Sequence, residues 1–421
     1  MDFLKNKAKS SARPATPSKP NTSRSKLVQS PYRVPSGKLI PKHRPTNSYG
    51  GVLQSDRSHG QLKESISKPV LKTTYDTRPK DVKSVLGHRK SSSIAERPSS
   101  LPLTDPEFTH KRKYSIDRIK IEVILSFSYK TMTGYMPGNP AKVNQDSFIT
   151  IQNLTDECTF FGVADGHGIN GKEVSSFIKE RFPILLSKDP NLLGNPRKAL
   201  SVCANKTNLD LAHQEFDVNF SGSTFVSILI RGKKLWCANI GDSRAFIARQ
   251  LPDTYQSYKN IRSKPIGNHW MSIALSRDHK PNESDESSRI LKHGGRVEAY
   301  QDEHGNPFGP ARVWLKNQNI PGLAMSRSLG DRVAGSVGVI CEPEILEFDL
   351  TPEDKFIVLG SDGIFEFLSN EDVLKIVVPY WRINDVNGAS EVLAKEAKYK
   401  WMKEEEVIDD ITCIVIFLNV P

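Results

Sequence analysis

Short apolar runs alternate with polar turns along the chain from residue 116 onward. Runs rich in Val, Ile and Phe and bounded by Gly, Asp, Asn or Ser are typical of strands. They predict nine strands, at residues 121–127, 147–151, 159–164, 224–230, 235–240, 245–248, 272–275, 355–359 and 412–418. Longer segments with capping residues at their starts predict five helices, at residues 171–186, 197–216, 283–293, 370–378 and 388–403.

The order of these elements indicates the fold class. Strands follow one another at the beginning and at the end of this region, and the helices are grouped between them. Regular alternation of strand and helix would instead favour a parallel sheet. The sequence therefore predicts an α+β fold in layers.

Composition separates the first hundred residues from the rest. Residues 1–100 contain 18 Ser, 10 Pro, 21 Lys and Arg and only 6 Asp and Glu, whereas residues 101–421 carry 38 basic and 42 acidic side chains. Such a polar segment cannot bury enough apolar surface to offset the chain entropy lost on ordering. We expect residues 1–115 to form a disordered basic tail and residues 116–421 to form the folded domain.

The charge of this tail has two interpretations. It is either a solubilising segment or a docking arm for an acidic partner. Aromatic residues are not interleaved with the basic ones, so nucleic-acid binding is not expected.

The cysteines and the apolar runs bear on the compartment. Five cysteines stand singly, with no CxxC pair, and no apolar run approaches the roughly 18 residues of a spanning helix. No apolar leader follows the first basic residues. We expect reduced thiols and a cytoplasmic or nuclear protein without a membrane span, and we expect a monomer.

Acidic residues stand where apolar runs begin or end. The positions are Asp146, Asp165, Asp242, Asp362, Asp409 and Asp410. Each one alone is explained by a turn, since Asp and Gly favour turns after strands. Strands lying side by side would nevertheless bring several of these carboxylates together.

Clustered carboxylates repel one another unless a cation neutralises them. An all-oxygen ligand set without clustered His or Cys suits Mg²⁺ or Mn²⁺ and does not distinguish between them. Because Gly166 lets the backbone approach closely, its carbonyl is a further candidate ligand. A two-metal site polarises a phosphoryl oxygen and supplies a hydroxide. The spacing predicts metal-assisted phosphoryl hydrolysis, with a magnesium-dependent nuclease or a nucleotide hydrolase as alternatives.

Eight short motifs occur in a characteristic order. They are VNQDS at 143–147, FGVADGHG at 161–168, SGST at 221–224, NIGDSR at 239–244, LSRDHKP at 275–281, GLAMSRSLGD at 322–331, LGSDGIFE at 359–366 and DDIT at 409–412. This series resembles the metal-dependent, type 2C (PPM-type) Ser/Thr protein phosphatases. The resemblance covers residues 116–421 and implies a four-layer α-β-β-α sandwich of two mainly antiparallel sheets flanked by helices.

The resemblance also implies a set of metal ligands. Asp165 would bridge two ions, the Gly166 carbonyl would bind the first, and Asp362 and Asp409 would bind the second. Asp146 matches an acidic residue that holds metal-bound water. In the family, Asp242 together with Asp362 can hold a weaker third ion.

The residues that would contact the substrate are His167 and Lys142. His167 matches the general acid that protonates the leaving seryl or threonyl oxygen, a task suited to an imidazole that titrates near neutrality. Animal members carry an Arg five residues before the position of Asp146, where this chain has Ala141 followed by Lys142. Lys142 would then bind the substrate phosphate as a point charge, without the bidentate fork of Arg.

The region from 281 to 323 corresponds to the variable flap beside the family's cleft. Its Gly and Pro residues predict a mobile loop rather than core, with Arg296, Arg312 and Lys316 as further candidates to touch substrate, although a solvated loop explains any one of them better than a specific contact does.

Two functions follow from these features. The first is a Mg²⁺- or Mn²⁺-dependent phosphatase that acts on phosphoserine and phosphothreonine of proteins by direct attack of metal-activated water. The alternative is a phosphoprotein-binding scaffold of the same fold, with little turnover because Ala141 replaces the Arg. A scaffold has no need to keep Asp165, Gly166, Asp362 and Asp409 together, which favours the enzyme.

Overall fold

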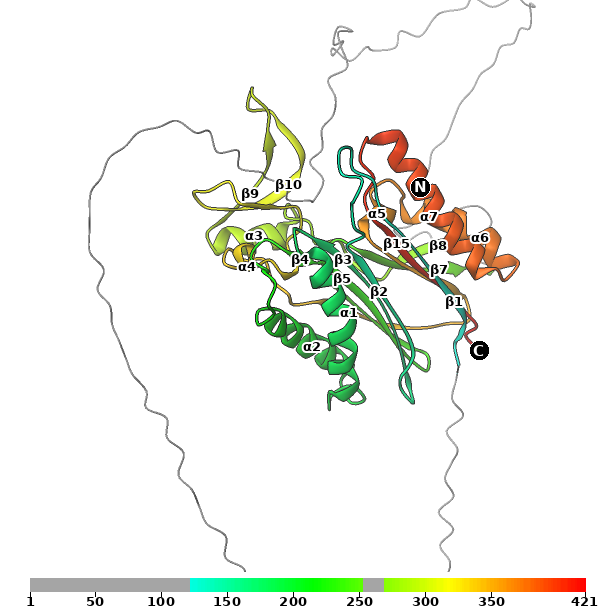
Figure 1. Ribbon diagram of the computed structural model, residues 1–421. Coiled ribbons are helices and arrows are strands. Elements are labelled where there is room, and N and C mark those ends of the chain that lie inside the picture. Colours follow the sequence, from blue (N-terminus) through cyan, green and yellow to red (C-terminus); the bar gives the residue numbers. More distant parts are fainter. Residues whose placement is uncertain (1–121, 253–268) are drawn as a thin grey trace, which may run out of the picture. The chain divides into compact units, whose positions relative to one another are not determined.

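The structure is a computed structural model that describes residues 122–252 and 269–421 (Figure 1). The predicted tail, residues 1–115, and the predicted start of the domain at residue 116 lie outside the described residues.

Two antiparallel sheets form the centre of the domain. The first has the order β1-β15-β14-β7-β8. Its strands are β1 (Ile124–Met132), β15 (Ile411–Leu418), β14 (Asp354–Gly360), β7 (Arg244–Gln250) and β8 (Trp270–Ala274). The second has the order β12-β4-β3-β5-β6-β13, and β2 pairs with β3. Its strands are β2 (Asp146–Thr155), β3 (Cys158–His167), β4 (Gly222–Ser223), β5 (Phe225–Arg231), β6 (Lys234–Ile240), β12 (Leu329–Gly330) and β13 (Glu344–Asp349).

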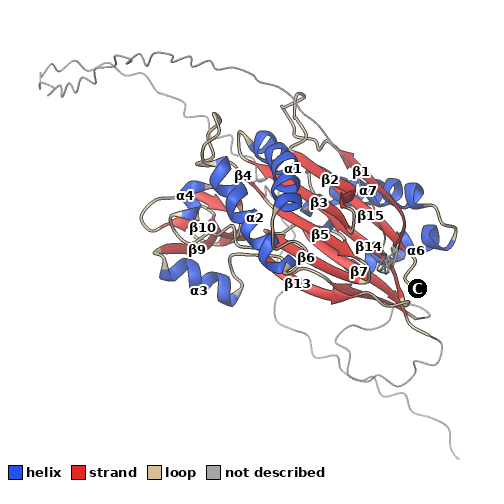
Figure 2. Cartoon of the chain, turned by 90° about the horizontal axis from the view of Figure 1, so that it is seen from below, coloured by secondary structure: helices blue, strands red, loops and turns tan. Residues whose placement is uncertain are grey.

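Helices cover the outer face of each sheet (Figures 1 and 2). Helices α1 (Gly171–Lys188) and α2 (Pro196–Leu211) pack on the second sheet, and α6 (Asn370–Arg382) and α7 (Val386–Glu404) pack on the first. One apolar core lies between each helix pair and its sheet, and a third core, which includes Phe161 and Ile416, lies between the sheets. Three stacked cores make four layers, so the predicted α-β-β-α sandwich is confirmed.

The predicted strands and long helices are all present, with ends that differ by a few residues. The start of α6 shows why these predictions succeed. Ser369 Oγ accepts a hydrogen bond from the Asp372 backbone N–H, and the Asp372 carboxylate accepts one from the Ser369 backbone N–H. This capping box was visible in the sequence as a polar residue ahead of an acidic first turn.

The prediction of a mobile loop over residues 281–323 was wrong, although the helix predicted at 283–293 is present as α3 (Ser284–Lys292). This flap contains α3 and a three-stranded sheet of β9 (Gly295–Gln301), β10 (Pro307–Leu315) and β11 (Pro321–Leu323). A small core of its own, including Ile290, Val313 and Leu323, stabilises it. Of the Gly and Pro residues that suggested a loop, Gly294 and Gly305 occupy turns and Pro307 begins the central strand β10. Gly309 and Pro310 lie where the register between β10 and β9 shifts, and strands tolerate Gly and Pro at such irregularities.

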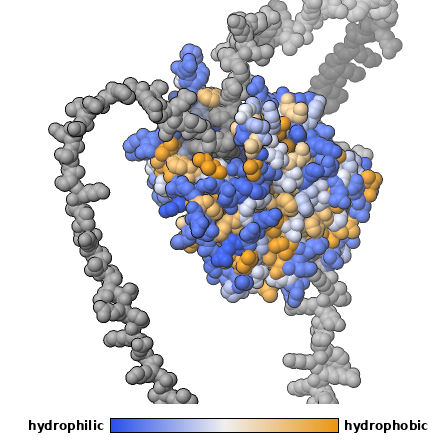
Figure 3. All heavy atoms as spheres, viewed as in Figure 1, coloured by the Kyte–Doolittle hydropathy of each residue, from blue (hydrophilic) through white to orange (hydrophobic). Residues whose placement is uncertain are grey.

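Five further elements were not predicted because they are short or amphipathic. They are α4 (Arg332–Gly335), α5 (Asp362–Phe365), β13 and the pair β4 and β12. No described helix is both long enough and apolar enough to cross a membrane. On the face seen in Figure 3, hydrophobic residues form scattered groups among polar ones.

Candidate active site

The second sheet contributes two of the predicted carboxylates. Asp146 is the first residue of β2, and the antiparallel register places it opposite Asp165 near the end of β3. A strand that begins and a neighbour that ends at one edge bring their side chains together. Gly166, the next residue of β3, packs so closely that a Cβ there would collide with the Gly171 carbonyl oxygen.

The first sheet contributes the other three. Asp362 follows β14 as the first residue of α5, Asp409 stands two residues before β15, and Asp242 lies in the turn between β6 and β7. In the ladders, Gly360 at the end of β14 pairs with Cys413 on one side and with Arg244 on the other. All three carboxylates therefore lie at the same edge of this sheet.

Hydrogen bonds between the sheets bring the two edges together. Ser361 Oγ donates to Asp146 Oδ2 at 2.9 Å and accepts from the Thr412 backbone N–H at 3.1 Å. Thr224 Oγ1 accepts from the Asp165 backbone N–H at 3.1 Å and lies 2.6 Å from Ser243 Oγ. These contacts fix the separation of the two carboxylate groups.

The carboxylates have strongly perturbed acidity. Burial, with repulsion from Asp409 and Asp410, raises the pKa of Asp146 to about 7. Burial and repulsion from Asp409 and Asp242 raise the pKa of Asp362 to about 8. For the same reasons the pKa values of Asp165 and Asp409 lie above their ordinary range. The basic side chains nearby therefore neutralise only part of the negative charge of these carboxylates.

The site's oxygens fit a divalent cation. Oδ1 of Asp146, of Asp242 and of Asp362 is buried without a hydrogen-bond partner, and a buried acceptor left unsatisfied is costly. Within the described ranges, no three acidic, His or Cys side chains already stand in metal-binding geometry. The orphaned oxygens and the mutual repulsion are nevertheless what a hard cation with oxygen ligands would relieve.

His167 ends β3 and is only 4% exposed. Its Nε2 lies 2.6 Å from Asp331 Oδ2, and its Nδ1 has no hydrogen-bond partner. Burial alone would lower the pKa of His167, but the adjacent Asp331 carboxylate raises it above the usual value. Ser328 Oγ also donates to Asp331 Oδ2, at 2.5 Å, so the carboxylate is firmly held.

Lys142 is engaged by another residue. Its Nζ lies 2.5 Å from Asp410 Oδ1, and its side chain is 15% exposed. Asp410 also accepts hydrogen bonds from the backbone N–H groups of Gly134 and Gln145. This network ties the loop ahead of β2 to the start of β15. A contact between Lys142 and a substrate phosphate stays a prediction.

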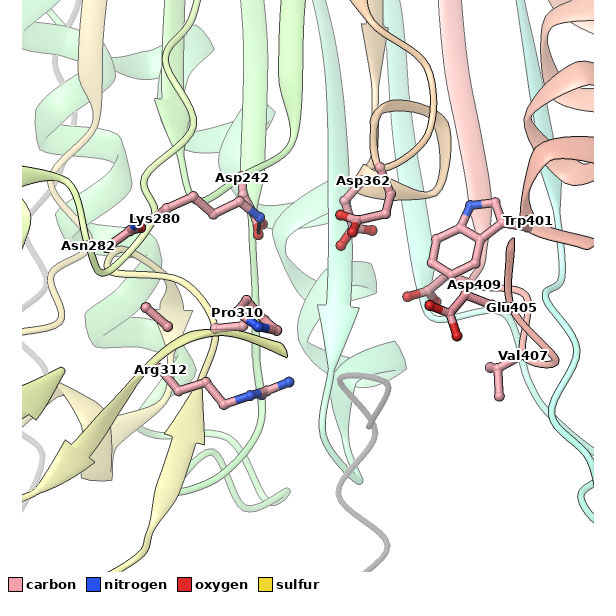
Figure 4. A pocket seen from close by; sticks show the side chains of 13 residues that line it. Asp242, Lys280, Asn282, Pro310, Arg312, Asp362, Trp401, Glu405, Val407 and Asp409 are labelled. Carbon is pink, nitrogen blue, oxygen red and sulfur yellow. Dashed lines mark hydrogen bonds and ion pairs between the residues drawn. The ribbon is translucent and has the colours of Figure 1, made fainter. Parts of the chain in front are cut away.

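A cavity of about 230 Å³ opens beside the carboxylates (Figure 4). Asp362, Asp409, Glu366, Glu405 and Trp401 line one part of it. Lys280 and Asp242 line another, and the Arg312 side chain extends into it from β10. The cavity therefore joins an acidic wall to two basic side chains.

The three flap residues predicted as candidates to touch substrate differ in their position relative to the cavity. Arg312 is 4% exposed, donates from Nη1 to the Gly322 carbonyl at 2.6 Å and lies over the Tyr300 ring. Arg296 instead pairs with Glu298 at 2.6 Å, and neither Arg296 nor Lys316 is among the residues that line the cavity.

Sequence reasoning missed the supporting roles of four residues at this site. Lys280, Asp331, Ser361 and Asp410 all lie within the motif series, so their positions gave a signal. Their partners come from strands and loops distant in sequence, which a motif alone does not name.

Comparisons with known proteins identify the family of this chain. The sequence profile of the family "Protein phosphatase 2C" matches residues 140–405. A similar relative is "Probable protein phosphatase 2C 35" of Arabidopsis thaliana, 35% identical over 306 residues that cover 69% of this chain and 83% of the relative. "Probable protein phosphatase 2C 73" of Oryza sativa subsp. japonica is 33% identical over 313 residues, covering 66% and 70%.

Solved structures give the same fold. The serine-threonine phosphatase 2C from Toxoplasma gondii superimposes with a TM-score of 0.58 at 18% identity, covering 70% of this chain and 97% of that one. The profile match, the relatives and the fold agree, and the chain belongs to the protein phosphatase 2C family.

Proposed function

We propose that this chain is a Mg²⁺- or Mn²⁺-dependent phosphatase that hydrolyses phosphoserine and phosphothreonine in proteins. The observation that carries the proposal is the meeting of four carboxylates at the adjacent edges of the two sheets, those of Asp146, Asp165, Asp362 and Asp409. All four have raised pKa values, and Asp146 and Asp362 each keep a buried oxygen without a hydrogen-bond partner. Burial and mutual repulsion make this arrangement of carboxylates unfavourable in free energy, and bound cations would offset that unfavourable term.

Each residue has a place in this proposal. Asp165 would contact two ions, with the Gly166 carbonyl on one and with Asp362 and Asp409 on the other, while Asp146 would orient the attacking water. When bound, the ions polarise the phosphoryl oxygens and lower the pKa of water enough to supply a nucleophile. Ser361 keeps Asp146 oriented through its 2.9 Å hydrogen bond.

His167 would protonate the leaving oxygen. Because Nε2 is engaged by Asp331, the proton would leave from Nδ1, which has no other partner. An alkoxide is a poor leaving group, so this proton contributes most with alkyl phosphates such as phosphothreonine.

We also propose that Arg312 binds the substrate phosphate. Ala141 has no charge to offer, and Lys142 is paired with Asp410. The Arg312 guanidinium is held by the Gly322 carbonyl and the Tyr300 ring and lines the cavity. Its planar fork matches two phosphate oxygens.

The test is phosphate release from a phosphothreonine peptide in Mg²⁺, in Mn²⁺ and in EDTA. We expect metal-dependent turnover by the wild type, with a loss of at least about a hundredfold in Asp165→Asn and in Asp362→Asn. Asp210→Asn is the matched control, since Asp210 on α2 forms an exposed ion pair with Arg181 on α1, away from the site.

Two results would contradict the proposal. Turnover in EDTA equal to that in Mg²⁺ would remove the metal dependence. A folded wild type that binds the phosphopeptide but releases no phosphate in either metal would instead favour the scaffold.

A further inference from the structure

A lysine occupies the part of the site where Asp242 lies. Lys280 stands in the loop between β8 and α3, and its Nζ lies 2.5 Å from Asp242 Oδ2. Asp242 is 2% exposed, while the Lys280 side chain keeps 32% of its exposure and lines the cavity. Figure 4 shows the two side chains meeting at one end of the cavity, with Asp362 across from them.

More than one carboxylate acts on this ammonium. Burial alone would lower the pKa of Lys280, but Asp242, Asp362 and Asp278 raise it above its ordinary value. The effect is mutual, because Lys280 lowers the pKa of Asp362 against the repulsion of the other carboxylates. Lys280 is therefore a fixed positive charge shared between Asp242 and Asp362.

Asp242 and Asp362 each keep an oxygen that could bind a cation, but the Lys280 ammonium already lies beside Asp242. Asp242 Oδ1 and Asp362 Oδ1 are buried and without partners. A divalent ion bound to both would lie close to the Lys280 ammonium and be repelled by it. Binding of that ion therefore requires Lys280 to leave Asp242.

We propose that the Lys280 ammonium is a tethered cation that takes the place of a third divalent ion between Asp242 and Asp362. The inference rests on the proposed two-metal function and adds to it that this chain excludes, or strongly weakens, the third ion. Lysine suits the task because an ammonium is a compact point charge without a coordination geometry to satisfy.

The test counts Mn²⁺ ions bound to the full chain, by electron paramagnetic resonance and by calorimetry, with Mn²⁺ alone and no substrate. We expect Asp242→Asn to leave the number bound by the wild type unchanged. Lys280→Met should bind one additional ion, about tenfold to a hundredfold tighter than any such binding in the wild type. The double variant Lys280→Met/Asp242→Asn should lose that ion again.

Three controls separate charge from structure. Lys280→Arg keeps a cation beside Asp242 and should bind as the wild type does. Lys355→Met removes a lysine that donates to the Pro352 carbonyl far from the site and should change nothing. If Lys280→Met does not fold in EDTA, Lys280→Gln, which can still donate to Asp242, gives the same comparison.

The failures are distinguishable. A wild type that already binds an Asp242-dependent ion as tightly as Lys280→Met would overturn this inference and leave the proposed function intact. The same holds if neither Lys280→Met nor Lys280→Gln gains an ion. A folded wild type that binds no Mn²⁺ would overturn both.

Discussion

The two walls of the cavity are supported by hydrophobic cores of very different size. The acidic wall stands at the ends of strands whose ladders run through the two large sheets, and three extensive cores hold those sheets. The wall that carries Arg312 belongs to a three-stranded sheet with a small core of its own around Ile290 and Val313. Figure 1 shows β9 and β10 to one side of the sandwich.

Because of this difference, the carboxylates proposed to bind metal are positioned independently of the flap proposed to bind substrate. The distances between carboxylates follow from strand register and from Ser361, so they change only if the sandwich changes. The flap can vary in sequence and position without disturbing those distances, because it shares little of their core. Regions of low contact with the main core also open at lower free energy.

The largest effect should come from the core between the sheets. Phe161 on β3, the strand that carries Asp165, is fully buried, and its ring centroid lies 5.1 Å from that of Phe127. Phe161→Ala should lower the free energy of unfolding by about 3–5 kcal/mol and weaken Mn²⁺ binding. Denaturant unfolding and Mn²⁺ titration measure both.

The matched change in the flap is Val313→Ala, at a residue just as buried. It should leave Mn²⁺ binding unchanged and lower phosphopeptide turnover. An equal loss of Mn²⁺ affinity in both variants would show that the geometry of the acidic wall depends on the packing of the flap.

The acidic wall should make the stability of the metal-free protein depend on pH. Asp362 has a folded pKa of about 8 and Asp146 one of about 7, while the unfolded chain ionises near 4. Between pH 6.5 and pH 8 the folded state holds protons that the unfolded state has lost, so stability falls as pH rises. We expect a loss of about 2 kcal/mol over this window in EDTA.

Thermal unfolding at both pH values measures this slope. Saturating Mn²⁺, which binds the ionised carboxylates, should remove or reverse it, and Asp362→Asn should flatten it. A stability that rises from pH 6.5 to pH 8 in EDTA would mean that the carboxylates are not held protonated.

Arg312 should affect substrate rather than metal. Arg312→Lys keeps the charge but loses the fork, and we expect kcat/KM for a phosphothreonine peptide to fall about tenfold, mostly through KM. Arg296→Lys is the control on the same sheet. Equal effects of the two substitutions would place the phosphate contact elsewhere.

The smallest effect should come from the tip of the flap. Asp302 accepts hydrogen bonds from the backbone N–H groups of His304 and Asn306 in the exposed turn between β9 and β10. Asp302→Ala should cost about 0.5–1 kcal/mol or less and leave Mn²⁺ binding unchanged. A large loss of peptide turnover would instead assign the tip to substrate binding.

The amino-acid sequence by itself determined the layered α+β fold and the carboxylate positions. Apolar runs of strand length, capping residues such as Ser369 and acids at strand ends are local signals, and local signals are read directly from a sequence. The motif order added the family and, through it, the candidate ligands.

Only the tertiary structure decided how the charges are paired. Lys142 binds Asp410, Lys280 binds Asp242, and His167 binds Asp331, each across many residues of sequence. The flap's small sheet was hidden for a similar reason, since the few buried apolar side chains of its strands form a core only when they meet Ile290 of α3. Such pairings depend on which elements the fold brings together, and the order of residues along the chain does not state that.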